Sequence, residues 1–182
     1  MPKLIMLNGP PGSGKDYATK IIMDELVDEE PVHMKLSKPL KDVVSNFFGA
    51  SIEQLEENKD KATDFSMTFR DAQINVYEQV AKVFGRQWLA VSLVNRIKQF
   101  DNNFIIVSDV GREEELTTLI KNFGARNILL LQIYRKGTTF AHDIRQYIDD
   151  PRIMSSLVRN DGTANFKLEL MNEVYTFLDG DN

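Results

Sequence analysis

The residues with the clearest chemical signature form a glycine-rich run from Gly9 to Lys15, Gly-Pro-Pro-Gly-Ser-Gly-Lys. It has the spacing of a P-loop (Walker A motif), in which backbone N–H groups and a lysine hold nucleotide phosphates. The helix expected to begin there adds positive potential for an anion. The run predicts ATP-binding residues Pro11, Gly12, Ser13, Gly14, Lys15, Asp16 and Tyr17, with Lys15 acting catalytically on the β- and γ-phosphates.

Asp16 departs from the P-loop pattern, which has Ser or Thr here as a Mg²⁺ ligand. A carboxylate is also a hard oxygen ligand, so Asp16 is expected either to bind Mg²⁺, directly or through water, or to orient the phosphate acceptor. A third reading is that it only complements the helix dipole. Asp109, at the end of an apolar run, is the second expected metal residue, and its alternative role is to cap the next helix.

Phosphoryl transfer requires alignment and neutralised charge, so cations from several segments must converge on the moving group. The segment at about 135–151 has little periodicity and predicts a flexible loop or a small helical lid. Arg135 and Arg145 flank this segment and are the predicted catalytic cations over the γ-phosphate. For each of them the alternative is a solvated loop arginine.

The elements that must position these residues alternate between strands and helices. Apolar runs predict strands at 3–7, 32–36, 104–107 and 127–134, and helical spacing predicts helices at 17–26, 40–48, 113–123 and 165–178, with two more between 69 and 100 that break near Gly85. Residues 50–68 fit a short helix with an exposed connection, and residues 153–159 fit either a strand or a helix. The alternation predicts an α/β fold of the P-loop NTPase type, with three layers in which helices flank a parallel sheet.

The bulk properties limit the partners. With 182 residues and 42% hydrophobic content, we expect one domain spanning 1–182. The net charge of −5 is spread along the chain, which argues against binding a nucleic-acid polymer. The chain has no cysteine, which excludes disulfides and thiolate sites and suits a reducing cytoplasm. Its first apolar run is too short for a signal peptide or a membrane span, so we expect a cytoplasmic protein with no membrane partner.

The sequence Gly14-Lys15-Asp16 resembles the end of the P-loop in the phage-type deoxynucleoside monophosphate kinases. Further short matches are Leu36-Ser37-Lys38-Pro39-Leu40-Lys41, Arg70 with Gln73, Gly85 with Trp88, Asp109, Ile133-Tyr134-Arg135 and Asn160-Asp161-Gly162-Thr163. The resemblance implies a helical acceptor-binding region at about 37–100 and an arginine-bearing lid at about 135–151. It would also place a phage-encoded protein in the host cytoplasm.

The resemblance implies that the acceptor is held by Ser37, Lys38, Arg70, Gln73, Trp88 and Arg112. A guanidinium matches two phosphate oxygens, so Arg70 is the best candidate for the phosphate that the acceptor already carries. Gln73 lies one helical turn later and would bond a base or sugar, unless it is only a surface residue. Trp88 lies in an apolar stripe, which favours the core over stacking on a base. The family would have an arginine where Gly111 stands, so the role of Arg112 stays open.

Together these observations predict an enzyme that uses ATP and Mg²⁺ to convert deoxynucleoside monophosphates to diphosphates for DNA synthesis. One alternative is a kinase of another phosphorylated small molecule such as phosphomevalonate, although Gln73 and the aromatic residues near it favour a nucleobase. The other is a nucleotide-dependent switch, against which the lack of an obvious water-positioning glutamine near Asp109 argues. The oligomeric state is left open, with a homodimer as one option.

Overall fold

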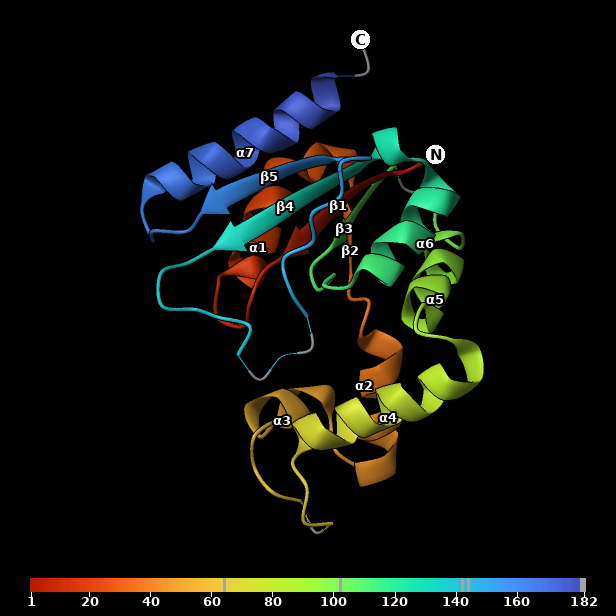
Figure 1. The fold of residues 1–182 in the computed structure, drawn as a ribbon. Coiled ribbons are helices and arrows are strands. Elements are labelled where there is room, and N and C mark those ends of the chain that lie inside the picture. Colours follow the sequence, from red (N-terminus) through yellow and green to blue (C-terminus); the bar gives the residue numbers. More distant parts are fainter. Residues whose placement is uncertain (64, 102, 142, 144, 181–182) are drawn as a thin grey trace.

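The computed structural model describes residues 1–63, 65–101, 103–141, 143 and 145–180. Within this part a single parallel sheet has the strand order β2-β3-β1-β4-β5 (Figure 1). Its strands are β1 (Lys3–Asn8), β2 (Val32–Met34), β3 (Phe104–Val107), β4 (Ile128–Tyr134) and β5 (Met154–Arg159). The α-helices are α1 (Lys15–Glu25), α2 (Lys38–Phe48), α3 (Ile52–Glu57), α4 (Phe69–Phe84), α5 (Trp88–Ile97), α6 (Glu113–Phe123) and α7 (Ala164–Asp179), with 3₁₀ turns at Val27–Glu29 and Ala125–Asn127.

The sheet is covered by helices on both faces. Successive side chains of a strand point to opposite faces, and β1 therefore sends Leu4 and Met6 into a core with α5 and α6, and Ile5 and Leu7 into a core with α1 and α7. All four side chains are fully buried, which explains why the strand is a continuous apolar run. The predicted three-layer α/β fold is confirmed.

Helices α2, α3 and α4 form a separate lobe beyond the edge of the sheet (Figure 1). Val44, Leu55 and Ala72 make its small core. Capping boxes at Ser51 and Thr68 fix where α3 and α4 begin, because each side chain accepts a bond from an otherwise unpaired N–H group. This lobe carries part of the helical region expected at 37–100.

The sequence left two segments open, at 153–159 and at about 135–151. Residues 154–159 form the edge strand β5, which decides between the strand and the helix that the sequence left open for residues 153–159. The described part of the 135–151 segment holds turns and no helix, which rules out the helical form of the lid there. None of the helices in the described ranges is long and apolar enough to cross a membrane.

Candidate active site

The glycine-rich loop is closely wound between β1 and α1. Gly12 and Gly14 have φ angles of 78° and 100°, which side-chain-bearing residues rarely adopt. The ammonium of Lys15 donates hydrogen bonds to the carbonyl oxygens of Gly9 and Pro10, at 2.7 and 2.8 Å. Burial, followed by the nearby Arg145 charge, lowers the pKa of Lys15 to about 8. The loop thus encloses a cation that is easier to deprotonate than an ordinary lysine.

A turn after β5 supports this loop from behind. The buried Asn160 side chain donates a hydrogen bond from Nδ2 to the Ser13 carbonyl at 2.8 Å, and its backbone N–H donates to the Tyr134 carbonyl at 2.7 Å. A Cβ atom on Gly14 would lie 2.1 Å from Asn160 Nδ2, so only glycine fits there. The run from Asn160 to Thr163 was noted in the sequence only for its resemblance to a family. Its first residue stabilises the glycine-rich loop.

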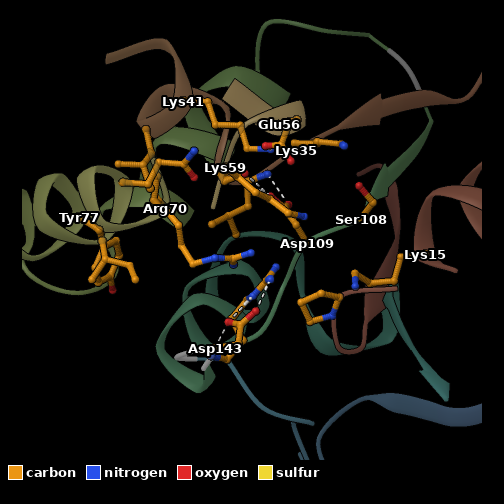
Figure 2. Close-up of a pocket in the computed structure, with 18 of the residues that line it drawn as sticks. Lys15, Lys35, Lys41, Glu56, Lys59, Arg70, Tyr77, Ser108, Asp109 and Asp143 are labelled. Carbon is orange, nitrogen blue, oxygen red and sulfur yellow. Dashed lines mark hydrogen bonds and ion pairs between the residues drawn. The ribbon is translucent and has the colours of Figure 1, made fainter. Parts of the chain in front are cut away.

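A cavity of about 290 Å³ opens beside the loop (Figure 2). Its walls come from the P-loop, the β2–α2 connection, the α2–α4 lobe, the segment at 108–115, and the residues Asp143 and Arg145. The predicted site residues that line it are Pro11, Gly12, Lys15, Asp16, Ser37, Arg70, Gln73, Asp109, Arg112 and Arg145. Residues from five separate parts of the sequence therefore meet in one place.

Six predicted site residues lie outside this lining: Ser13, Gly14, Tyr17, Lys38, Trp88 and Arg135. Tyr17 is exposed and stacks on Phe166, with ring centroids 6.0 Å apart. Trp88 packs against the core, as its apolar stripe had favoured, and does not offer a face to the cavity. Lys38 forms an ion pair with Asp42 at 2.7 Å, and Arg135 is exposed.

Asp109 holds the connection between β2 and α2. Its Oδ1 accepts a hydrogen bond from the Leu36 N–H at 2.6 Å, and its Oδ2 accepts from the Ser37 N–H at 3.0 Å and the Ser37 hydroxyl at 2.6 Å. It does not cap α6, whose N-cap residue is Arg112, so that alternative was wrong. Both carboxylate oxygens of Asp109 accept hydrogen bonds from the protein. Each oxygen keeps a lone pair for a ligand, but these bonds hold the side chain in place.

Asp16 is less constrained than Asp109. It lies in the first turn of α1 with a side chain that is 83% exposed, and its Oδ1 is 3.2 Å from Lys35 Nζ. In the described part of the chain, no cluster of three or more His, Asp or Glu side chains forms a metal site. A Mg²⁺ ion at Asp16 or Asp109 would therefore need phosphate oxygens and water as its other ligands.

Arg145 reaches the cavity from residues 145–148, a segment over the carboxyl ends of the strands that we call the strap. Its guanidinium forms a two-point ion pair with Asp143, whose side chain is 7% exposed, with Nε–Oδ1 at 2.9 Å and Nη2–Oδ2 at 2.5 Å. A Cβ on Gly111 would come within 2.6 Å of three Arg145 side-chain carbons. Arg145 therefore fills the space beside Gly111, the position where the family pattern would have an arginine. Sequence reasoning missed Asp143.

Asn8 fastens the strap to the end of β1. Its buried amide donates to the carbonyls of Val110 and Gln146, at 2.9 and 3.0 Å, and its oxygen accepts from the Ile148 N–H at 3.2 Å. Sequence analysis did not single out Asn8. A polar residue directly after the apolar run from Leu4 to Leu7 is the signal that would have marked it.

Arg112 lies between two residues that sequence analysis did not single out. Its guanidinium carbon is 3.7 Å from the ring centroid of Tyr77, and its Nη1 is 3.6 Å from the Glu115 carboxylate. Glu115 also accepts hydrogen bonds from the N–H groups of Gly111 and Arg112. Burial raises the pKa of Glu115 to about 7, and the Arg112 charge only partly opposes this.

Comparisons with known proteins identify a family and a fold. A family model described as phosphomevalonate kinase matches residues 7–125, whereas a search of curated proteins found no significant match. The fold resembles a sugar kinase from Janibacter sp. HTCC2649, with 12% identity, a TM-score of 0.51, and coverage of 98% of this chain and 95% of that chain. It also resembles a dephospho-CoA kinase from Campylobacter jejuni, with 9% identity, a TM-score of 0.50 and full coverage of both chains.

Identities this low show a shared fold and leave the substrate undecided. The specific resemblance to phage-type deoxynucleoside monophosphate kinases stays a prediction. The family model, however, spans more than half of the chain and includes the P-loop, α4 and the Asp109 segment. The chain therefore belongs to the phosphomevalonate kinase family and has the fold of small-molecule kinases.

Proposed function

We propose that this chain transfers the γ-phosphoryl group of ATP to the phosphate of a deoxynucleoside monophosphate. The observation that carries the proposal is that one cavity holds Lys15 of the P-loop on one side and Arg70 of α4 on the other (Figure 2). A cation on each side suits two phosphorylated substrates that meet between them. The rest of the lining gives each side a distinct role.

The donor side supports ATP binding. The wound loop places Gly12 and Lys15 in the lining, where backbone N–H groups and a cation suit a phosphate. We expect a phosphate to draw Lys15 away from its two loop carbonyls, because a charged acceptor forms the stronger bond. Arg145 lines the same cavity and would add positive charge near the transferring group.

Mg²⁺ fits this site as an ion that accompanies the nucleotide. The exposed carboxylate of Asp16 is the freer of the two oxygen donors, since Asp109 is fastened to the β2–α2 connection. We assign Asp16 as the protein's ligand and Asp109 as a positioning residue. The bound ion would neutralise charge on the phosphate oxygens during transfer.

The acceptor side supports a phosphate joined to an apolar ring. Arg70 donates a hydrogen bond from Nε to Asp60 Oδ1 at 2.8 Å, and its other two guanidinium nitrogens can bind the acceptor phosphate. Gln73 lies one turn along α4 in the same lining and would bond the edge of a base. The lining also includes apolar side chains that would pack against a base: Leu36, Leu40, Ile74 and Leu89.

Phosphomevalonate is the second candidate acceptor. The family match over residues 7–125 favours it, and so do Lys41 and Lys59, extra cations in the lining that would suit a carboxylate. Neither candidate changes the roles assigned to Lys15, Asp16 and Arg145.

An acceptor panel tests the proposal. The protein would be incubated with ATP, Mg²⁺ and each of the four deoxynucleoside monophosphates, the matching ribonucleotides or phosphomevalonate, and the products separated by anion-exchange chromatography. We expect a deoxynucleoside diphosphate that forms with the wild type and is lost with Lys15→Ala. Transfer to phosphomevalonate alone would replace the first candidate with the second. Release of ADP at the same rate without any acceptor would favour a nucleotide-dependent switch.

A further inference from the structure

A second cavity, of about 550 Å³, lies beside the edge strand β2, next to the start of α2 and α3 and the end of α5. Its apolar lining comes from Val32, Met34, Ile52 and Phe100. It shares Lys35, Lys41 and Glu56 with the candidate active site, and these three side chains lie together at one side of that site (Figure 2). An ion pair between Lys41 and Glu56, at 2.6 Å, therefore belongs to a wall common to both cavities.

Positive charge is concentrated in this cavity. Lys35, Lys38, Lys41 and Arg96 line it, against the single carboxylate of Glu56. The whole chain has a net charge of −5, so this is a local reversal of sign. A cavity lined by one sign of charge with low-dielectric walls attracts ions of the opposite sign.

Arg96 is the cation in this lining whose charge is least compensated. Each of the three lysines forms an ion pair, with Asp16, Asp42 and Glu56 respectively. Within the described residues Arg96 has no carboxylate at ion-pair distance; its Nη2 donates to the Lys35 carbonyl at 2.9 Å, and its buried Nε has no partner.

Electrostatics supports the same reading of Arg96. Burial lowers the pKa of Arg96, and the more distant Asp109 and Asp42 charges only partly oppose that effect. A partly buried guanidinium without a counter-charge is unfavourable, and an anion in the cavity would relieve the cost.

We propose that this cavity is a binding site for a small organic anion, separate from the ATP and acceptor sites. Its phosphate or carboxylate group would pair with Arg96, and its apolar part would pack against Met34, Ile52 and Phe100. The proposal does not depend on the identity of the acceptor, because it rests on side chains outside the P-loop and α4.

Calorimetric titration with phenyl phosphate and with benzoate tests the site, since the two probes present the two anionic groups on the same ring. We expect saturable binding of at least one probe to the wild type. Arg96→Gln should weaken it about tenfold, the effect of losing one charge-assisted hydrogen bond. Phe100→Ala should weaken it severalfold through lost apolar contact. Lys98→Gln removes a neighbouring exposed cation outside the lining and should leave binding unchanged.

Two comparisons keep the test decisive. If Arg96→Gln does not fold, as judged by its thermal transition, Phe100→Ala and Arg96→Lys carry the test in its place. In Arg70→Ala binding should be unaffected; loss there, with retention in Arg96→Gln, would mean that the probe occupies the acceptor cavity and would overturn the proposal. Failure of both probes to bind the wild type, or inorganic phosphate binding as tightly as phenyl phosphate, would overturn it too. These readouts need no turnover, so they hold whatever the acceptor panel finds.

Discussion

The carboxylate of Asp109 accepts hydrogen bonds from both the backbone N–H and the hydroxyl of Ser37, at 3.0 and 2.6 Å. This contact joins the carboxyl end of β3 to the residue that precedes α2, 72 positions away in the sequence. It fixes one wall of the candidate active site, because Ser37 and Asp109 both line the cavity. The same carboxylate was expected to serve Mg²⁺, and the two roles can be separated by experiment.

Substitution of Asp109 tests its positioning role. Asp109→Asn places an amide N–H₂ group where one oxygen accepts bonds from Leu36 or Ser37, so the β2–α2 connection should loosen. We expect the acceptor KM to rise about tenfold, with the Mg²⁺ concentration for half-maximal rate unchanged within about twofold. Initial rates over both concentrations measure this, with the exposed Asp24→Asn as control. A change confined to the Mg²⁺ requirement would instead make Asp109 a metal ligand.

Lys15 should give the reaction a characteristic pH dependence. Its pKa of about 8 means that the free enzyme loses this charge as the pH rises through 8, so kcat/KM for ATP should fall there. Lys15→Arg stays protonated and should lack that decline, whereas Lys15→Ala should lower kcat at least about a hundredfold. Rates measured from pH 6 to 10 check both. A Lys15→Arg profile identical to that of the wild type would assign the decline to another group.

Arg70 should act on the acceptor alone. We expect Arg70→Ala to raise the acceptor KM about tenfold or more and to leave the ATP KM within about twofold, because the lost interaction is one charge-assisted pair. Asp60→Asn is the matched control, since it removes the partner of Arg70 Nε but keeps the guanidinium. Steady-state kinetics in both substrates separate the effects, and a defect mainly in ATP would mean that the two sites have been interchanged.

Asn8 should matter to stability as well as to rate. Asn8→Ala leaves two carbonyls and one N–H without their partner beneath the 145–148 strap, which should cost about 2 kcal/mol or more of unfolding free energy. Asn122→Ala, on an exposed helix surface, should change it by less than about 0.5 kcal/mol. Urea denaturation measures both variants. We also expect a lower kcat for Asn8→Ala through a displaced Arg145, and equal stability of the two variants would contradict this reading.

Glu115 should make the fold less stable as the pH rises. Its pKa is about 7 in the folded chain against an ordinary 4.5, so the folded state favours the protonated form and loses that advantage as the pH rises towards and through 7. Relative to Glu115→Gln, which cannot ionise, the wild type should lose at most about 3 kcal/mol between pH 5 and 8. Denaturation curves at both pH values give the difference. A difference in unfolding free energy between the wild type and Glu115→Gln that is the same at both pH values would show that Arg112 fully compensates the Glu115 charge.

The sequence alone was enough for the elements and the phosphate loop, because these depend on local patterns. A continuous apolar run predicted β1, helical spacing predicted α4 and α5, and the break between them falls at Gly85, whose φ is 83°. The glycine-rich loop followed from spacing alone for the same reason. Where the local pattern was mixed, as in β5 at the edge of the sheet, it did not decide between strand and helix.

Only the tertiary structure decided which side chains share the site. Tyr77 lies below Arg112, Trp88 packs into the core, and Arg145 fills the space left by Gly111. Each of these facts depends on contacts between residues far apart in the chain. Composition and periodicity carry no information about such contacts. A residue's type sets what it can bond, but its neighbours across the fold determine whether that bond goes to the protein or is left for a ligand.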